Sequence, residues 1–248
     1  MIREQDFTER YMKLKKMRFS GMAEELKAQF EDDQIDKISA EERIFRLIDA
    51  ESQTRDSKKF ARLIKAADLR YPDASINLKL LEQPGIEKTL LERLSQCKWI
   101  DEKKNLLITG KTGTGKSYCA CALAGAAAAG FRTVHYFKAS RLLRELQNAE
   151  NCQTLTEELN RLANYDLLII DDFGLMNLDM DMCRNLFELI DIRDGRKANI
   201  FISQYPVSEW YEMFKDSTYA DACLDRLTGN AYRLQFTGES HRRDPQEE

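Results

Sequence analysis

The sequence has little of several things that mark particular protein classes. It holds two histidines and six cysteines without a CxxC pair, so a zinc site is not expected, and the cysteines should be reduced and mostly buried. It contains no long apolar run, and its first segment, Met1–Phe19, is interrupted by charges throughout. We therefore expect neither a signal peptide nor a membrane span, and we expect the protein in the cytoplasm.

A large excess of either charge is also missing. The formal net charge of the 248 residues is -4 at pH 7, which argues against a protein that coats nucleic acid with a basic surface. A local basic patch remains compatible with this charge. The length suffices for one α/β domain of ordinary size and a small second domain.

The most informative feature that is present is the run GKTGTGKS, Gly110–Ser117. Glycines at this spacing let the backbone turn tightly and direct several N–H groups at one anion, while the lysine supplies a charge and the serine a hydroxyl for Mg²⁺. The apolar run Asn105–Thr109 before the loop and the Ala-rich stretch Tyr118–Ala129 after it predict the strand and helix that such a loop needs. We therefore expect ATP or another nucleoside triphosphate to be bound by Gly110, Lys111, Thr112, Gly113, Thr114, Gly115, Lys116, Ser117 and Tyr118.

A second acidic element should lie on a neighbouring strand, and the stretch DLLIIDDFG, Asp166–Gly174, fits this place. Asp171 would hold the Mg²⁺ shell, directly or through water, and Asp172 would polarise the attacking water. Two adjacent carboxylates at the end of a strand can instead cap the next helix. The phosphate-binding loop upstream favours the metal site.

The apolar patterns divide the chain into a helical part and an α/β part. A long helix starts at the capping box Ser39–Glu42 and is expected to run to Tyr71, because Pro72 follows. Further on, strand patterns alternate with helical ones, which predicts a parallel five-stranded sheet with helices on both faces. The expected strands are Asn105–Thr109, Thr133–Phe137, the acidic strand, Ile200–Ser203 and Tyr232–Phe236. The predicted domains are a helical DNA-binding or interaction domain (1–75), a linker (76–100), an ATPase domain (101–238) and a polar tail (239–248).

A basic stripe runs along the long helix. Its members share one face at helical spacing and are Arg55, Lys58, Lys59, Arg62 and Lys65. Apolar residues from Phe60 to Ala67 fall roughly opposite, and acidic partners are sparse, with Asp56 and Asp68 nearby. A DNA phosphate backbone would supply the missing counter-ions, whereas a solvated helix face is the alternative. A second, less specific cluster comprises Arg10, Lys13, Lys15, Lys16 and Arg18.

The second half of the chain carries phrases more specific than the phosphate-binding loop. Behind the helical part the chain reads GKTGTGKS, LLIIDDFGL, ISQYPVSEWYE and LDRLTGNAYRLQFTGES, in that order. It resembles the IstB family of transposition helper ATPases, relatives of the helicase loader DnaC within the AAA+ group, over nearly its whole length. The resemblance implies a P-loop AAA+ fold without the usual helical lid, hydrolysis of ATP to ADP and phosphate with Mg²⁺, and a homo-oligomer.

The resemblance also implies a sensor for the terminal phosphate. Ser203 and Gln204 match that polar position, and Gln204 is favoured because its amide reaches further. A plain turn residue before Pro206 is the alternative. The family pattern of the wider AAA+ group has glutamate where this chain has Asp172, and the shorter side chain predicts slow turnover.

Arg226 matches the arginine that AAA+ proteins insert into a neighbouring subunit's nucleotide site. A surface arginine paired with an aspartate of its own helix is the alternative. Arg193 and Arg233 are weaker candidates for the same role. Arg242 or Arg243 could replace the second sensor arginine that a lid usually carries.

Together these features predict an ATP-dependent switch. ATP and Mg²⁺ would join subunits through Lys116, Ser117, Asp171 and the neighbour's Arg226, and the oligomer would bind duplex DNA without sequence preference. By resemblance, it would deliver this target to a transposase and stimulate it. Three alternatives remain: a DnaC-like helicase loader, a small-molecule kinase, which would need a lid over its acceptor, and a scaffold whose nucleotide is only structural.

Overall fold

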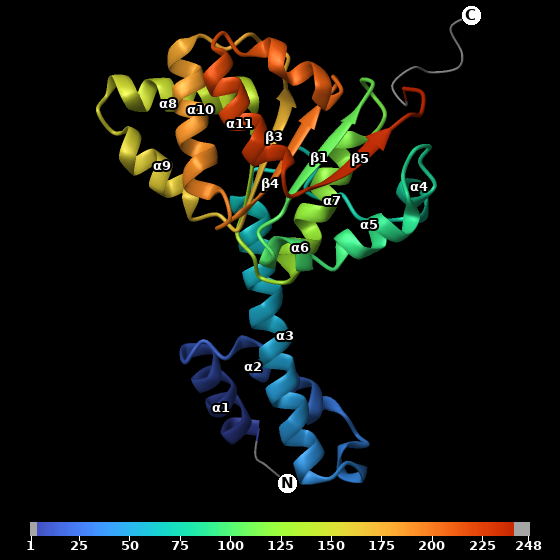
Figure 1. Cartoon of the computed structure of the whole chain (residues 1–248). Coiled ribbons are helices and arrows are strands. Elements are labelled where there is room, and N and C mark those ends of the chain that lie inside the picture. Colours follow the sequence, from blue (N-terminus) through green and yellow to red (C-terminus); the bar gives the residue numbers. More distant parts are fainter. Residues whose placement is uncertain (1–3, 241–248) are drawn as a thin grey trace, which may run out of the picture. The chain divides into compact units, whose positions relative to one another are not determined.

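The computed structural model describes residues 4–240 and divides into two compact units, which extend over Met1–Arg62 and Leu63–Glu248. The first unit contains α1 (Glu4–Lys16), α2 (Ser20–Glu31), the 3₁₀ helix η1 (Ile35–Lys37) and most of α3 (Ala40–Ala66) (Figure 1). The buried carboxylate of Glu51 on α3 accepts hydrogen bonds from the backbone N–H groups of Gly21 and Met22, at 2.8 and 3.2 Å. Because the first N–H groups of a helix lack partners within it, this carboxylate stabilises the start of α2.

Helix α3 begins as the capping box predicts. The Ser39 hydroxyl accepts a hydrogen bond from the backbone N–H of Glu42 at 3.2 Å. The helix face that was expected to pack is covered unevenly, since Ala67 just beyond the helix is buried and the Phe60 side chain is exposed. Most side chains of α3 are therefore exposed or partly exposed.

The end of α3 differs from the prediction, which placed it at Tyr71. The helix stops at Ala66, and Asp68 takes a left-handed backbone conformation with φ 51°. The reason is a contact distant in sequence: the carbonyl oxygen of Ala67 accepts a hydrogen bond at 2.9 Å from the backbone N–H of Tyr136, on a strand at the edge of the sheet. That bond directs the chain away from the helical path before the proline is reached.

The second unit is built on the predicted parallel sheet of five strands. Their order is β2-β3-β4-β1-β5, and every neighbouring pair is parallel. Each strand lies within two residues of its expected position, because each is a short apolar run bounded by polar or turn residues. The strands are β1 (Asn105–Gly110), β2 (Val134–Lys138), β3 (Leu167–Phe173), β4 (Ala198–Ser203) and β5 (Ala231–Phe236).

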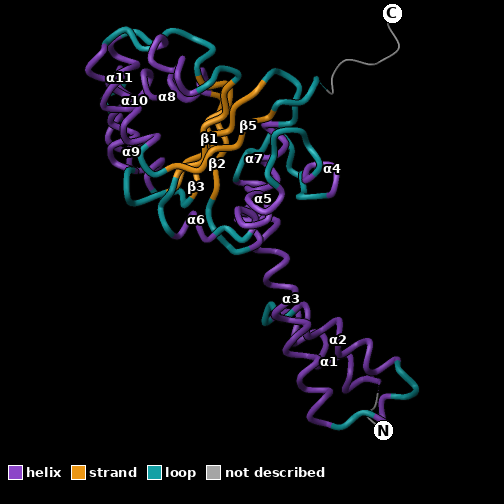
Figure 2. The backbone as a smooth tube through the Cα atoms, turned by 45° about the vertical axis from the view of Figure 1, so that its right-hand side comes forward, coloured by secondary structure: helices purple, strands orange, loops and turns teal. Residues whose placement is uncertain are grey.

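Helices cover both faces of this sheet, as Figure 2 shows. On one face, Leu106 and Ile108 of β1 pack in the core that includes α7 (Lys116–Ala129). On the other face, Leu107 packs in a second core with four helices, because successive side chains of a strand point to opposite sides. These helices are α8 (Ala139–Asn151), α9 (Leu155–Ala163), α10 (Met180–Arg193) and α11 (Ser217–Thr228). The 3₁₀ helix η2 (Val207–Met213) also contributes to this core.

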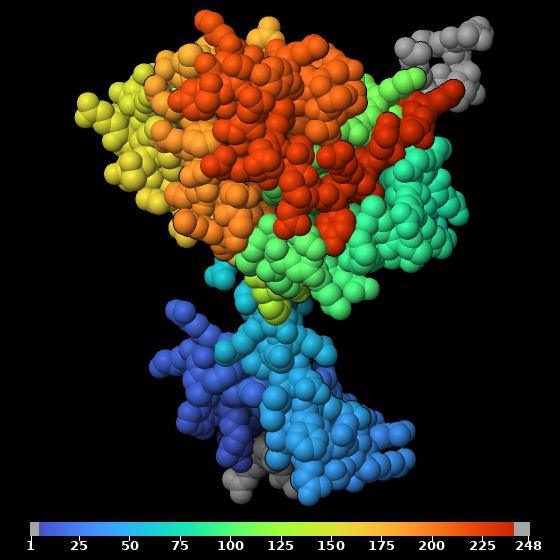
Figure 3. All heavy atoms as spheres, viewed as in Figure 1, coloured from blue at the N-terminus to red at the C-terminus, as the bar shows by residue number. Residues whose placement is uncertain are grey.

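The segment predicted as a linker, residues 76–100, belongs to this unit. It folds into α4 (Leu78–Leu81), α5 (Lys88–Ser95) and the first residues of α6 (Lys98–Asp101), and its buried members in the core beside α7 are Leu80, Leu91, Leu94, Trp99 and Ile100. After β5, the Thr237 N–H donates to the Pro84 carbonyl oxygen at 3.1 Å, and in Figure 3 the red residues there lie against the blue-green ones of α4 and α5. The compact unit begins at Leu63, before the predicted boundary at residue 75, because a connecting helix and a core helix have the same apolar pattern.

All six cysteines are free thiols and five of them are buried. Burial raises the pKa of Cys119 and of Cys223 to about 12 each. These thiols are therefore protonated at neutral pH and act as small apolar residues. Between residues 4 and 240 no helix is long and apolar enough to span a membrane.

A buried arginine, Arg193, ends α10. It is fully buried, which removes it from the candidates for a neighbour's nucleotide site. Burial lowers its pKa to about 9, so the guanidinium is still charged at neutral pH. Its acceptors are Asn199 Oδ1 at 2.6 Å and the carbonyl oxygens of Leu162, Tyr165 and Ala198 at 2.6, 3.0 and 2.6 Å.

Two buried amides extend this arrangement across the sheet. Asn199 on β4 donates to Oδ1 of Asn105 at 2.9 Å, and the Asn105 amide donates to the backbone carbonyl oxygen of Arg226 at 3.3 Å. The start of β1 is thereby tied to the last turn of α11. Each buried polar group in this chain of contacts has a partner, as the low dielectric of an interior requires.

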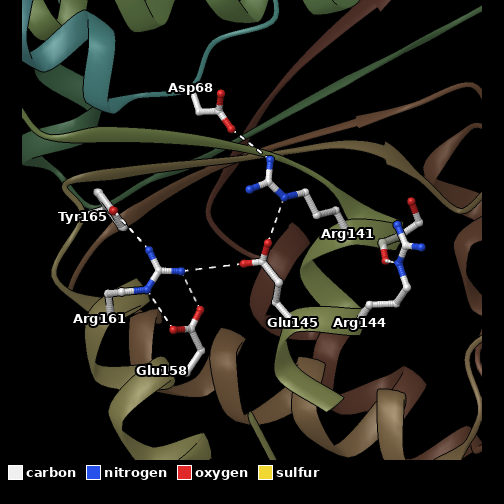
Figure 4. Close-up of polar contacts among 8 residues, drawn as sticks. Asp68, Arg141, Arg144, Glu145, Glu158, Arg161 and Tyr165 are labelled. Atoms are coloured by element: carbon white, nitrogen blue, oxygen red, sulfur yellow. Dashed lines mark hydrogen bonds and ion pairs between the residues drawn. The ribbon is translucent and has the colours of Figure 1, made fainter. Parts of the chain in front are cut away.

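A network of exposed charges joins the turn after α3 to α8 and α9 (Figure 4). Arg141 on α8 contacts Asp68 at 2.9 Å and Glu145 at 2.8 Å. The remaining members are Arg161, Glu158 and Tyr165. Such pairs contribute little each, because water screens them.

Arg141→Gln is expected to leave the midpoint of urea unfolding nearly unchanged, because water screens the exposed pairs that Arg141 makes. Urea unfolding followed by circular dichroism measures this change. Arg144→Gln is the matched control, because Arg144 lies on the same helix and donates to the Ser140 carbonyl oxygen of that helix. A clear drop of the midpoint relative to the control would mean that the turn after α3 depends on the Asp68 contact for its fold.

Candidate functional site

Three neighbouring strands end at one edge of the sheet. Because β3, β4 and β1 are adjacent and parallel, the residues that follow them meet there. Two cavities lie at this edge and share three residues of the phosphate-binding loop, Gly113, Lys116 and Ser117. One has a volume of about 380 Å³ and the other of about 230 Å³.

The phosphate-binding loop joins β1 to α7. Gly115 precedes α7 with φ 95°, a conformation that favours glycine. Gly110 lies so close to β5 that a Cβ atom would stand 2.3 Å from the carbonyl oxygen of Phe236. The Lys116 ammonium donates to the Lys111 carbonyl oxygen at 2.7 Å, so the loop folds around this charge.

Asp171 is the most constrained side chain of the site. It is 1% exposed, and its Oδ2 accepts hydrogen bonds from the Ser117 hydroxyl at 2.6 Å and the Tyr136 hydroxyl at 2.5 Å. Its Oδ1 accepts from the backbone N–H of Asp172 at 2.7 Å. Burial and the charge of Asp171 raise the pKa of Tyr136, which therefore remains a donor. The pairing of Ser117 with Asp171, predicted from sequence, places a hydroxyl and a carboxylate together as hard ligands for Mg²⁺.

Asp172 has a left-handed backbone conformation with φ 59°. It lies where the register between β3 and β4 shifts. In a regular strand, neighbouring side chains point to opposite faces, so the irregularity lets both Asp171 and Asp172 line the 230 Å³ cavity. The Asp172 carboxylate pairs with Lys138 Nζ at 3.1 Å.

The two sensor candidates have different surroundings. Ser203 is buried, and its hydroxyl donates to the Phe173 carbonyl oxygen at 2.6 Å, which ties the end of β4 to β3. Both residues line the 230 Å³ cavity, and Oε1 of Gln204 accepts a hydrogen bond from the Thr112 hydroxyl at 2.5 Å. Of the pair, Gln204 is the one that touches the phosphate-binding loop.

The larger cavity lies beside the loop. Its walls include the aromatic rings of Tyr71 and Tyr118, whose centroids are 6.0 Å apart, and Leu80. The Tyr118 hydroxyl accepts from the Asn77 amide at 3.3 Å. A cavity with an apolar and aromatic wall and a few polar groups, next to a phosphate-binding loop, suits a nucleoside. Tyr118 was among the expected nucleotide-binding residues. The segment around Tyr71 was expected to end a helix and to connect domains, so the parts of this wall that Tyr71 and Leu80 form were missed.

Sequence reasoning also missed three residues around the carboxylates, namely Tyr136, Lys138 and Arg70. Tyr136 and Lys138 belong to β2, where Lys138 is the cross-strand partner of Asp171. Arg70 follows α3 and lines the 230 Å³ cavity together with Lys138. No local pattern marks these residues, although a polar residue at the end of the strand that neighbours the acidic one is a usable signal.

Arg226 lines neither cavity of its own chain. On α11 its guanidinium pairs with Asp191 of α10 at 2.8 Å and lies over the Phe187 ring, 4.9 Å from the centroid. Its partner is thus an aspartate of the neighbouring helix, not one of its own helix. Arg233 is exposed on β5, and Arg242 and Arg243 lie outside the described residues.

The five basic residues of the α3 stripe are all exposed. One partner had been overlooked: Arg55 pairs at 2.7 Å with Glu51, four residues earlier. Lys58 donates to the Ser20 hydroxyl at 2.6 Å. In the second cluster, Lys15 pairs with Glu24. The stripe is therefore partly neutralised at Arg55.

The donor set suits a nucleoside triphosphate with Mg²⁺. Glycines with positive φ, a buried lysine, and a hydroxyl beside a carboxylate are what phosphates and a hard cation need. In the part of the chain that the structure describes, no group of three or more His, Cys, Asp or Glu side chains could hold a metal ion.

Comparison with known proteins gives one family. The family model described as IstB-like ATP binding protein matches residues 12–248. A candidate insertion sequence ATP-binding protein of Sinorhizobium fredii is 36% identical over 230 residues, which cover 93% of each chain. A candidate ATP-binding protein of an insertion sequence of Pseudomonas fluorescens is 36% identical over 196 residues, with 79% of this chain and 85% of that protein covered.

Solved structures show the same fold at low identity. The DnaC helicase loader superimposes with a TM-score of 0.55 and 17% identity, covering 71% of this chain and 98% of that one. AMPPCP-bound DnaA from Aquifex aeolicus gives a TM-score of 0.51 and 17% identity over 60% of this chain and 45% of that one. The predicted AAA+ fold is confirmed, and so is the resemblance on which it was based.

Proposed function

Because the chain belongs to the family of IstB-like ATP-binding proteins of insertion sequences, we propose that it is a Mg²⁺-dependent ATPase that oligomerises on duplex DNA and delivers this DNA to a transposase, which it stimulates. One observation carries the ATPase assignment. Lys116, Ser117, Asp171, Asp172 and Gln204, far apart in sequence, line a single cavity beside a second cavity of nucleoside size. Hydrolysis needs a charge for the phosphates, ligands for a cation and a carboxylate for water, and this cavity supplies all three.

Each residue has a distinct task in this proposal. Lys116 binds the phosphates, and Ser117 and Asp171 hold Mg²⁺, which neutralises charge on the phosphate oxygens when bound. The hydroxyl of Tyr136 fixes the orientation of the Asp171 carboxylate. Asp172 accepts a hydrogen bond from the attacking water, and its short side chain is consistent with slow turnover. Gln204 reports the terminal phosphate through its contact with the loop.

Arg226 is proposed to act in a neighbouring subunit. Its position away from both cavities of its own chain supports action on another chain's nucleotide. Its pair with Asp191 is partly exposed, so the interaction is weak enough to be exchanged for a phosphate. Hydrolysis would then require an oligomer and would remove the phosphate that holds it together.

The exposed stripe on α3 is the proposed DNA contact. Lys58, Lys59, Arg62 and Lys65 are the exposed basic residues of the stripe beyond the pair of Arg55 with Glu51. Lysines on phosphates carry no base information, so binding would be independent of sequence. An oligomer would present many copies of the stripe, and their combined affinity would be high and sensitive to salt.

The test combines light scattering with DNA binding at several salt concentrations, in ATP, in ADP and without nucleotide. The wild type is expected to form a large particle on duplex DNA with ATP alone. The triple variant Lys58→Gln, Lys59→Gln and Arg62→Gln should bind at least tenfold more weakly, and the slope of log affinity against log salt should fall by about three.

The matched control removes three exposed lysines of the second unit, through Lys88→Gln, Lys98→Gln and Lys215→Gln. It should leave DNA affinity within about twofold of the wild type. A protein that stays monomeric and ignores DNA in every nucleotide state would contradict the proposal. In that case co-purification with a replicative helicase would favour the helicase-loader alternative.

A further inference from the structure

The 230 Å³ cavity contains more positive charge than the phosphate-binding loop provides. Lys116 is the loop's cation, and Arg70 and Lys138 line the same cavity from other segments. Arg70 comes from the chain between α3 and α4, and Lys138 is the last residue of β2. The carboxylates that face these cations are Asp171 and Asp172.

The 230 Å³ cavity adjoins the 380 Å³ cavity at the phosphate-binding loop. Tyr71, Leu80 and Tyr118 line the larger cavity, and none of them lines the smaller one. Gly113, Lys116 and Ser117 line both cavities. A nucleotide with its base in the larger cavity and its first phosphates on the loop would therefore place its terminal phosphate in the smaller one.

Arg70 is held beside the carboxylates by aromatic residues. Its guanidinium lies 5.4 Å from the centroid of the Tyr71 ring. Partial burial would lower the pKa of Arg70, but Tyr71, Tyr136 and Asp171 together raise it. The Arg70 guanidinium is thus a cation beside the Tyr136 hydroxyl, which donates a hydrogen bond to Asp171, the proposed Mg²⁺ ligand.

Lys138 forms an ion pair with Asp172 that a phosphate can replace. Its ammonium pairs with Asp172 at 3.1 Å, and the two side chains are 51% and 32% exposed. An ion pair this exposed is weak. A terminal phosphate has more negative charge and more acceptor oxygens than one carboxylate, so it competes well for the ammonium.

We propose that Arg70 and Lys138 bind the terminal phosphate of the nucleotide held by their own chain, and that Lys138 leaves Asp172 when it does so. The chain then distinguishes ATP from ADP without a neighbouring subunit. Asp172 becomes available to the water only when a terminal phosphate has drawn Lys138 away. This inference rests on the proposed ATPase function of the same cavity.

Equilibrium competition against a fluorescent ADP analogue tests the proposal. AMPPCP and ADP, each with Mg²⁺, are titrated into the wild type, Arg70→Gln and Lys138→Gln, at protein concentrations where the chain is monomeric. Each variant should bind AMPPCP about tenfold more weakly, since a hydrogen bond to a charged group is lost. Affinity for ADP should stay within about twofold.

Arg144→Gln is the control, because Arg144 is an exposed arginine of α8 outside both cavities. It should change neither affinity. Arg70→Lys should retain part of the preference for AMPPCP, because it keeps the charge. Thermal unfolding without nucleotide should be the same for all variants if the two side chains serve the ligand and not the fold.

The outcomes separate this inference from the function on which it rests. Equal weakening of AMPPCP and ADP, or no weakening of either, would overturn the roles of Arg70 and Lys138 and leave the ATPase assignment intact. A wild type that binds neither nucleotide would overturn both. A loss confined to AMPPCP supports binding of the terminal phosphate.

Discussion

Arg226→Ala is expected to slow ATP hydrolysis in the DNA-bound assembly by about a thousandfold. The arginine would stabilise the charge that develops on the transferred phosphoryl group of a neighbouring subunit. Nucleotide affinity of the monomer should be unchanged, because Arg226 lines neither cavity of its own chain. Phosphate release at saturating ATP and DNA measures the rate, and Arg196→Ala, which removes an exposed arginine after α10, is the control.

Mixing two inactive variants tells whether the arginine acts between chains. Arg226→Ala keeps an intact nucleotide site, and Lys116→Ala keeps an intact arginine. If Arg226 serves its neighbour, the mixture should regain part of the activity that each variant lacks alone. A mixture as inactive as its components would place the action of Arg226 within its own chain and contradict the proposed switch.

Arg193→Met is expected to lower the free energy of unfolding by about 3–5 kcal/mol. Methionine fills a similar volume, but it leaves the Asn199 side chain and three carbonyl oxygens, at two buried contacts and one partly buried one, without the donor that Arg193 supplies. Urea unfolding followed by circular dichroism gives the value, with the exposed Arg144→Met as control. A change below about 1 kcal/mol would show that these acceptors find other partners.

The fold was predictable where the pattern is local. Each strand is a short apolar run, and the start of α3 follows from a cap within four residues, Ser39–Glu42. The end of α3 was not predictable, because it depends on a hydrogen bond that the backbone N–H of Tyr136, distant in sequence, donates to the Ala67 carbonyl oxygen. The role of residues 76–100 in the core was hidden for a similar reason, since burial depends on contacts and not on the pattern alone.

For the candidate site, too, residues in a local sequence pattern could be predicted and residues placed by distant contacts could not. The loop residues and Asp171 were predictable because spacing fixes their chemistry. Tyr136 and Lys138 lie beside the carboxylates because of the register in which β2 pairs with β3. Arg70 lies in the chain after α3, where the sequence pattern had predicted that the helix continues. The roles of Asp172, Gln204, Arg226 and the α3 stripe stay predictions that the experiments above address.

Strand β1 connects the phosphate-binding loop to Arg226, the two parts of the proposed switch. Its first residue, Asn105, holds the backbone of Arg226, and its last, Gly110, opens the phosphate-binding loop. Its six residues span about 17 Å, and pairing with β4 and β5 on either side leaves it little freedom to bend. A displacement of the loop would therefore be transmitted to the arginine offered to the next subunit. Adjacent sites could communicate by tilting whole domains, and no hinge inside the domain would be needed.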